Sequence, residues 1–311
     1  MSQLQPIVSK LLTNVLQGYV PSGFISEMIL PQLNVVQQGG KIAKRGLSHL
    51  RIETSLMGGK GMARRVEVRT YNSDTYYIMP YGLEEVLTPE EYKNVEKPFD
   101  LEKDTVMALQ MALYLGKEVG LATSLRSTSI ITQNTTLSGT SQWNDFANST
   151  PLVDILTAKK VVRAASGAKV DTAIADADVW DTLRYHPTLV RSLGYADNRA
   201  GQLTDADLAK ALNVKRILSA DVLYNSAKEG QADSLTSVWG KDVILAACPE
   251  TAGIDQKSLG YRVQFAGDSS RKVYKQPVVN PPESNSIIVK DSYDQVLTDV
   301  KCAYLIKTAI A

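Results

Sequence analysis

The chain has 311 residues, and its 34 Lys and Arg against 33 Asp and Glu give a formal net charge of +1. A nearly neutral chain is not a general nucleic-acid binder, because affinity for phosphates comes from an excess of Lys and Arg. The length is enough for one large or two modest domains with a sizeable core. The sequence contains no run of 18 apolar residues, so we expect no transmembrane helix and no membrane partner.

Residues 1–40 are expected to form an arm rather than a domain. The segment after Gly18 is rich in Pro, Gly and Gln and carries too few apolar side chains to fold alone. We therefore expect it to lie on another surface. A short amphipathic helix before Gly18 is predicted by apolar residues at helical spacing, namely Leu4, Ile7, Leu11 and Val15.

Residues 41–79 predict an extended β-hairpin loop. Residues 41–69 carry eight Lys or Arg against two Glu, and apolar side chains alternate with polar ones at 50–52 and 66–68, as in two strands. A two-stranded hairpin is only marginally stable in water, so this one is expected to rest on another surface. The alternative is a surface loop without a partner.

An acidic stretch follows the hairpin. Residues 76–79 predict a strand, Pro80-Tyr81-Gly82 a turn, and Thr88-Pro89 the start of a helix. From Glu84 to Asp104, eight acidic residues stand against three Lys.

The basic hairpin and the acidic stretch permit two interpretations. They are either two solvated faces of opposite charge, or the hairpin of one copy lies over the acidic stretch of the next. The second interpretation predicts inter-subunit contacts at nine charged residues, namely Arg51, Lys60, Arg64, Arg65, Arg69, Glu84, Glu85, Glu90 and Glu91.

The longest helical pattern runs from Pro98 to Arg126. Asp100 is placed to cap its start, and Glu102 and Asp104 suit the positive end of the helix dipole. Apolar residues fall on two stripes, so we expect the helix to be covered on two sides. The first stripe contains Leu101, Ala108, Met111, Leu115, Val119 and Ala122, and the second contains Val106, Leu109 and Leu113.

Beyond this helix the pattern changes to shorter helices and strands. A second helix is predicted from Pro151 to Gly167, and others near 179–183 and after Thr204. Residues 171–285 read as a separate α/β lobe, whereas the tail is expected to return to the sheet beside the long helix. Together these elements predict an α+β fold. The predicted strands are 214–218, 243–247, 261–265, 287–289 and 303–310.

Catalytic and metal sites are not indicated. Cys248 and Cys302 lie in apolar runs and are expected to be buried free thiols, and with His49 and His186 they lack zinc-ligand spacing. The chain has no nucleophile elbow and no phosphate loop. His186, which precedes Pro187 at a helix end, is expected to be a partly exposed structural residue. We therefore expect no enzymatic activity and no cofactor.

Taken in order, several motifs resemble the major capsid proteins of tailed phages with the Hong Kong 97-type fold. Each motif is short, and their order and spacing along nearly the whole chain carry the resemblance. They are Ile29-Leu30-Pro31 and Gly40-Lys41 in the arm, Asp74-Thr75-Tyr76-Tyr77 and Pro98-Phe99-Asp100-Leu101 before the long helix, Lys117-Glu118 within it, Gln142-Trp143-Asn144-Asp145, and Val238-Trp239-Gly240-Lys241-Asp242.

This resemblance implies a protein that self-assembles into the icosahedral head shell of a tailed phage and encloses double-stranded DNA. It implies an N-terminal arm at 1–40, an extended loop at 41–79, a peripheral domain at 80–170 and 286–311 with the long helix as its spine, and an axial domain at 171–285. The alternative is an encapsulin-like shell protein of a cellular nanocompartment.

The resemblance also implies partners and a location. The expected partners are copies of the chain in hexamers and pentamers, a portal protein, decoration proteins and packaged DNA in nonspecific contact. Some relatives begin with a long scaffolding segment, whereas about forty residues precede the loop here, so either scaffolding is a separate protein or the chain is a processed form; Met1 favours a separate scaffolding protein. The expected location is the virion, after assembly in the cytoplasm of the host bacterium.

Overall fold

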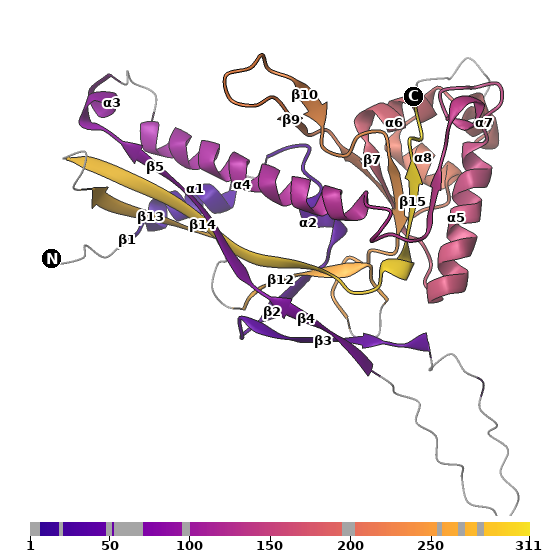
Figure 1. The fold of residues 1–311 in the computed structure, drawn as a ribbon, viewed down its shortest axis with the longest axis horizontal. Helices are drawn as coiled ribbons and strands as arrows, with labels where there is room; N and C mark the ends of the chain where they lie inside the picture. The colour runs from indigo at the N-terminus through magenta and orange to yellow at the C-terminus, as the bar shows by residue number, and fades with distance from the viewer. Residues whose placement is uncertain are drawn as a thin grey trace, which may run out of the picture.

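The computed structural model describes residues 7–18, 21–47, 52, 71–94, 100–194, 203–253, 257–266, 271–278 and 283–311. These residues form two mixed β-sheets, and helix α4 (Leu101–Leu125) packs against both of them (Figure 1). The other helices are α1 (Lys10–Gly18), α2 (Ser26–Ile29), α3 (Pro89–Asn94), α5 (Pro151–Ser166), α6 (Ala177–Arg184), α7 (Pro187–Ser192) and α8 (Asp205–Ala211).

The six-stranded sheet is built around the long central strand β14. Its strand order is β1-β13-β14-β12-β2, and β5 pairs with the other side of β14. All pairs are antiparallel except β12 with β2, which adds a strand of the arm in parallel. Helices α1 and α4 cover one face. The strands are β1 (Ile7–Val8), β2 (Gln32–Val35), β5 (Met79–Leu87), β12 (Gly260–Phe265), β13 (Arg271–Val278) and β14 (Ser284–Leu297).

The five-stranded sheet forms the core of the second lobe. Its order is β6-β15-β11-β7-β8, and every residue of β7 and β11 is buried, as expected for strands that are covered on both faces. Helices α5 to α8 pack on one face, and α2 and α4 pack on the other. The strands are β6 (Asn134–Thr136), β7 (Thr172–Asp176), β8 (Arg216–Ala220), β11 (Val243–Ala246) and β15 (Ala303–Lys307).

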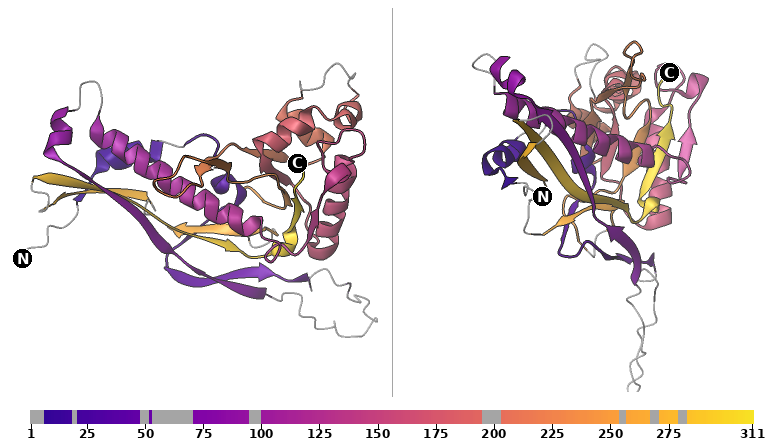
Figure 2. Two further views of the ribbon diagram at one scale, coloured as in Figure 1. Left: turned by 45° about the horizontal axis from the view of Figure 1, so that its top comes forward. Right: turned by 60° about the vertical axis from the view of Figure 1, so that its left-hand side comes forward.

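Two β-hairpins project from this body. Strands β3 (Gly39–Arg45) and β4 (Tyr71–Tyr77) pair antiparallel and leave the body beneath the six-stranded sheet (Figure 2). Strands β9 (Leu223–Asn225) and β10 (Leu235–Ser237) form a shorter hairpin on the second lobe. The β3–β4 pair lies at the base of the predicted loop, outside the two strands that the sequence predicts. Ile52 is exposed and in no strand, and the other strand residues predicted at 50–52 and 66–68 lie outside the described residues.

Helix α4 begins where the sequence predicts. The Asp100 carboxylate accepts a hydrogen bond from the backbone N–H of Lys103 at 3.4 Å, which satisfies one of the free donors of the first turn. At the other end, Arg126 pairs with Asp242 at 2.8 Å and donates to the carbonyl of Val238. The first half of α4 contacts α1 and the six-stranded sheet, and the second half contacts the five-stranded sheet.

The predicted first apolar stripe of α4 is partly wrong. Ala108 and Met111 are exposed, whereas the buried face carries Gln110, Lys117 and Glu118 among its apolar residues. Apolar periodicity assigns such polar positions to the solvent, so it places the stripe at the wrong angle. One face of the helix, rather than two opposite faces, is therefore buried.

The predicted turn at Pro80-Tyr81-Gly82 is wrong, because these residues lie within strand β5. A proline in a sheet lacks a backbone N–H and is tolerated at an edge. Among the described residues β5 pairs only with β14, so it is such an edge strand.

The expected axial domain at residues 171–285 does not coincide with one sheet. Strands β12 and β13 belong to the six-stranded sheet, and β15 of the tail joins the five-stranded sheet. Only β14 of the tail returns to the six-stranded sheet, as expected. Buried strands of both sheets look alike in sequence, so their composition does not show which sheet each one joins.

Two glycines should respond in opposite ways to substitution by alanine. A Cβ on Gly260 would lie 2.3 Å from the carbonyl oxygen of Val296, so Gly260→Ala should destabilise the fold by about 1–3 kcal/mol. A Cβ on Gly116 in α4 would meet nothing within 4 Å, so Gly116→Ala should stabilise it by about 0.5–1 kcal/mol. Denaturant unfolding of the two variants measures both effects, and equal effects would contradict this packing.

Candidate inter-subunit surfaces

Strand β5 presents an open edge at one side of the six-stranded sheet. All its residues from Met79 to Val86 are exposed, and only Leu87 is buried. Such an edge is a ready template for pairing with another chain. Glu84 and Glu85 lie on this strand, and Glu84 accepts a hydrogen bond from the Ser286 hydroxyl.

Helix α3 follows β5 directly, and none of its side chains is fully buried, although Tyr92 packs partly against the body. Glu91 accepts hydrogen bonds from the backbone N–H and the hydroxyl of Thr88, at 2.7 and 3.1 Å, and so fixes the start of the helix. Glu90 and Glu91 are exposed. The two consecutive elements β5 and α3 therefore carry Glu84, Glu85, Glu90 and Glu91.

The acidic stretch is less negative than its sequence suggests. Glu102 forms an ion pair with Lys275 of β13 and accepts a hydrogen bond from the Tyr92 hydroxyl at 2.9 Å. Burial and this carboxylate raise the pKa of Tyr92 to about 12. Within the described part of this stretch, the exposed acidic residues thus lie on β5, on α3 and around the N-terminus of α4.

The basic half of the predicted contact lies outside the described residues. Its members are Arg51, Lys60, Arg64, Arg65 and Arg69. The contact between them and the four exposed glutamates therefore stays a prediction.

A cluster of buried charges lies beneath these surfaces. Glu27 of the arm pairs with Lys117 of α4 and with Arg262 of β12, both at 2.9 Å, and also with Arg271 of β13. Asp291 of β14 pairs with Lys117 at 3.4 Å and with Arg271 at 3.2 Å. The cluster therefore joins the arm, the long helix and three strands of the six-stranded sheet.

Glu118 extends this cluster toward the second lobe. One carboxylate oxygen accepts hydrogen bonds from the backbone N–H of Ile25 at 3.2 Å and from the indole N–H of Trp239 at 2.7 Å. The other accepts from the N–H of Ser26 at 2.8 Å. Glu118 is fully buried, so these bonds replace the water that it loses on folding.

The six charges balance. Lys117, Arg262 and Arg271 pair with Glu27 and Asp291, whereas the adjoining Glu118 carboxylate is held by three N–H donors. Burial alone would raise the pKa of Glu27, but the three cations outweigh it and lower that pKa to about 2. Burial lowers the pKa of Lys117 in spite of its two carboxylate partners. Removing one member of such a group leaves an uncompensated buried charge, which is far more costly than the intact cluster.

Aromatic rings connect the cluster to the edge strand. The Lys117 ammonium lies 4.2 Å from the ring centroid of Tyr293, and this ring stacks on Tyr81 of β5 with a centroid distance of 4.7 Å. A cation over an aromatic face is attracted by the ring. The position of β5 thus depends on the same buried charges that hold the arm.

Sequence reasoning identified only one part of this cluster. Lys117-Glu118 entered as a motif of the family resemblance and not as a buried pair. The usable signal was the presence of two adjacent charges inside the longest apolar helix pattern. Nothing near Glu27, Arg262, Arg271 or Asp291 distinguishes them from surface charges, because their partners lie far away in sequence.

The expected buried thiols are confirmed, and the expectation for His186 is wrong. Cys248 and Cys302 are free and buried, and burial raises the pKa of Cys302 to about 12. His186 is fully buried rather than partly exposed. One ring nitrogen accepts from the N–H of Thr188 at the start of α7, and the other lies 3.0 Å from the hydroxyl of Ser149. His49 lies outside the described residues.

Sites for metals or membranes are not found in the part of the chain that the structure describes. No three His, Cys, Asp or Glu side chains there come together as a metal site would require. None of the described helices combines the length and the hydrophobicity that a membrane span needs.

Comparison with known proteins shows which proteins the chain is similar to. The chain is 26% identical over 270 residues to the major capsid protein of Burkholderia phage BcepMu, which covers 84% of this chain and 85% of that protein. The predicted resemblance to tailed-phage major capsid proteins is confirmed. That relative is a capsid protein, in agreement with the expectation of a structural rather than an enzymatic role. No family model matches the chain.

Solved structures share the fold of this chain. A phage-related protein from Bordetella bronchiseptica matches with a TM-score of 0.73 at 24% identity, covering 98% of each chain. The capsid structure of cyanophage P-SCSP1u matches with a TM-score of 0.59 at 10% identity, covering 93% of this chain and 90% of that one. The α+β class predicted from the sequence is therefore that of a phage capsid fold.

The Glu27 ion pairs should make stability depend on pH. The pKa of Glu27 falls from its ordinary 4.5 to about 2 on folding, so its stabilisation is present above about pH 5 and is lost as the pH falls toward 2. Glu27→Gln should cost about 2–3 kcal/mol at pH 7. Denaturant unfolding of both chains between pH 7 and 3 should show this difference shrinking. A difference that stays constant, as expected for an exposed control such as Glu90→Gln, would contradict the assignment.

Glu118→Gln should loosen the arm. The new amide group would place a donor against at least one of the three N–H groups that the carboxylate now binds, which costs about 1–3 kcal/mol for each unsatisfied group. Hydrogen exchange of the peptide containing Ile25 and Ser26 should become faster than in the wild-type chain and in Glu90→Gln. Unchanged exchange there would show that Glu118 does not hold the arm.

Proposed function

We propose that this chain is the major capsid protein of a tailed double-stranded DNA phage, and that it self-assembles into the icosahedral head shell around the genome. The similarity to a phage major capsid protein along 84% of the chain carries this proposal. The exposed edge strand, the projecting β3–β4 hairpin and the arm that lies on the body support it, because each of them suits contacts between copies.

The proposed domains follow the Hong Kong 97-like fold. Helix α4 is the spine of a peripheral domain that includes the six-stranded sheet, and the five-stranded sheet with α5 to α8 forms the axial domain. Residues 1–40 form the N-terminal arm and residues 41–79 the extended loop. This proposal keeps the boundaries of the arm and the loop, assigns β12 and β13 to the peripheral domain, and assigns β6, α5 and β15 to the axial domain.

In this proposal the extended loop of one copy lies on the acidic surface of a neighbour. That surface is formed by β5 and α3, whose four glutamates are exposed. Glu84 also accepts a hydrogen bond from the Ser286 hydroxyl. The loop carries the excess of Lys and Arg. Complementary charges of this kind guide association and fix the register of the partners.

Further partners follow from the same function. We propose hexamers and pentamers of this chain, a portal protein, a separate scaffolding protein and decoration proteins, together with nonspecific contact to packaged DNA. Assembly would take place in the host bacterial cytoplasm and the product is part of the virion. An encapsulin-like nanocompartment shell is the alternative, and the similarity to a phage protein favours the phage head.

Assembly of the purified chain tests the function directly. Expressed with a candidate scaffolding protein, the chain should form closed particles that sediment far faster than a monomer and appear as shells by electron microscopy. A monomer under every condition of salt and scaffold would contradict the proposal.

Charge reversal tests the loop contact. Arg64→Glu together with Arg65→Glu should reduce the yield of particles about tenfold, because two opposite charges become like charges. Adding Glu90→Lys and Glu91→Lys to the same chain should restore much of the yield. Lys10→Glu with Lys210→Glu is the matched control, since both lysines are exposed and lie elsewhere. Sedimentation measures the yield, and normal assembly of the first variant would remove the proposed contact.

A further inference from the structure

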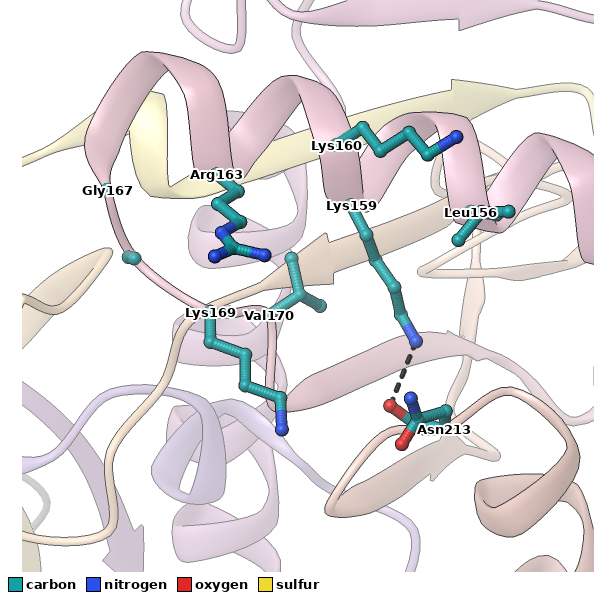
Figure 3. Close-up of a pocket in the computed structure, with 9 residues that line it drawn as sticks. Leu156, Lys159, Lys160, Arg163, Gly167, Lys169, Val170 and Asn213 are labelled. Carbon is teal, nitrogen blue, oxygen red and sulfur yellow. Dashed lines mark hydrogen bonds between the residues drawn. The ribbon is translucent and has the colours of Figure 1, made fainter.

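A cationic groove lies beside the C-terminal half of α5 (Figure 3). Its lining contains no carboxylate. In the close-up, Lys159 extends toward Asn213 and Arg163 toward Lys169. The lining residues are Leu156, Lys159, Lys160, Arg163, Gly167, Ala168, Lys169, Val170 and Asn213.

Most of the charge in this groove is uncompensated. The Lys159 ammonium donates to the carbonyl oxygens of Leu212 and Asn213, and burial together with the nearby Lys169 lowers its pKa. Lys160, Arg163 and Lys169 form no ion pair with any residue that the structure describes. A groove of this kind attracts an anionic group.

The same helix exposes apolar side chains, one of them next to the cations. Leu156 lines the groove and is 52% exposed, and Val153 and Val161 are exposed outside its lining. A phosphate backbone would leave these groups without a partner. A protein surface that carries both carboxylates and apolar side chains would cover them, as the apolar core and polar rim of a protein interface do.

The β9–β10 hairpin has the complementary character. Leu223 and Leu235 are 54% and 68% exposed. The segment 221–237 also carries three acidic residues against one lysine, namely Asp221, Glu229 and Asp233 against Lys228. It therefore combines apolar side chains with an excess of negative charge.

Hydrogen bonds within this hairpin hold its shape although it is exposed. The Asn225 side chain donates to Asp233 at 2.7 Å and accepts from the N–H groups of Ala227 and Ser234 at 3.0 and 3.1 Å. Among the described residues, β9 and β10 pair only with each other. A preorganised element that buries little of its own apolar surface binds a partner with little loss of conformational entropy.

We propose that the β9–β10 hairpin of one copy docks in the α5 groove of a neighbouring copy. This proposal rests on the proposed function, since it names one contact between the shell subunits. Leu235 and Leu223 would cover the aliphatic side chains around Leu156, and the hairpin carboxylates would pair with Lys160, Arg163 and Lys169. The hairpin and α5 lie on different sides of the second lobe, so the contact joins different copies (Figure 1). Such a head-to-tail contact repeats around a ring.

Charge exchange between the two surfaces tests this contact. Lys160→Glu with Arg163→Glu should lower the particle yield about tenfold, and so should Glu229→Lys with Asp233→Lys. The chain with all four changes should recover most of the yield. Lys10→Glu with Lys210→Glu is again the control. Thermal unfolding of each unassembled variant shows whether a loss of yield comes from misfolding.

Cross-linking provides a second measurement that does not depend on reversed charges. Leu156→Cys with Leu235→Cys should give disulfide-linked oligomers after oxidation of assembled particles, whereas Leu11→Cys with Leu235→Cys should not. The native cysteines are buried and should stay reduced. Absence of these oligomers together with normal assembly of the charge variants would overturn the contact and leave the shell function intact.

The remaining outcomes are also decisive. A wild-type chain that never forms oligomers would overturn both the contact and the shell function. The third measurement is the binding of a short DNA duplex by the wild-type chain and by the charge-reversal variant. If Lys160→Glu with Arg163→Glu assembles normally but loses duplex binding, the groove serves nucleic acid and the proposed contact is wrong.

Discussion

The buried charge cluster around Lys117 and Glu118 is the interaction on which the rest of the structure depends. Two adjacent side chains of α4 bind Glu27 and the backbone of the arm, strand β14 of the six-stranded sheet and Trp239 of the second lobe. Charges in a protein interior require partners of suitable geometry. The cluster therefore permits only one arrangement of these parts, whereas apolar packing alone would tolerate small shifts between them.

This constraint explains why a segment with little core of its own has a fixed position. The arm contributes Glu27 to the cluster, buries Ile29 and Leu30 beside α4, and adds β2 to the sheet, where Gln32 accepts a hydrogen bond from Arg262. Its outer elements can then be presented to other copies from a rigid body. In a shell, small errors in subunit shape accumulate over many repeats, so rigidity of the body has direct functional value.

Much of the fold could be predicted from the sequence, because its signals are local. Asp100, the Thr150-Pro151 start and Gly167 mark helix ends, and the structure has α4 and α5 between them. The errors come from long-range contacts. Met111 falls on the predicted apolar stripe but is exposed, because the buried face of α4 includes Lys117 and Glu118, which apolar periodicity does not select; β15 lies in the other sheet because strand partners are not encoded locally. Of the predicted contact residues, the glutamates lie on exposed elements. Their proposed ion pairs with the basic loop involve a second copy of the chain.

The chain thus combines a rigid two-sheet body with elements that suit contacts between copies: an edge strand, two hairpins and a cationic groove. Electron cryomicroscopy of particles assembled from the purified chain tests this account most directly. The account predicts closed icosahedral shells in which every subunit keeps α4 across both sheets and the arm against Lys117 and Glu118. Subunits that remain monomeric, or shells in which the arm leaves this cluster, would contradict it.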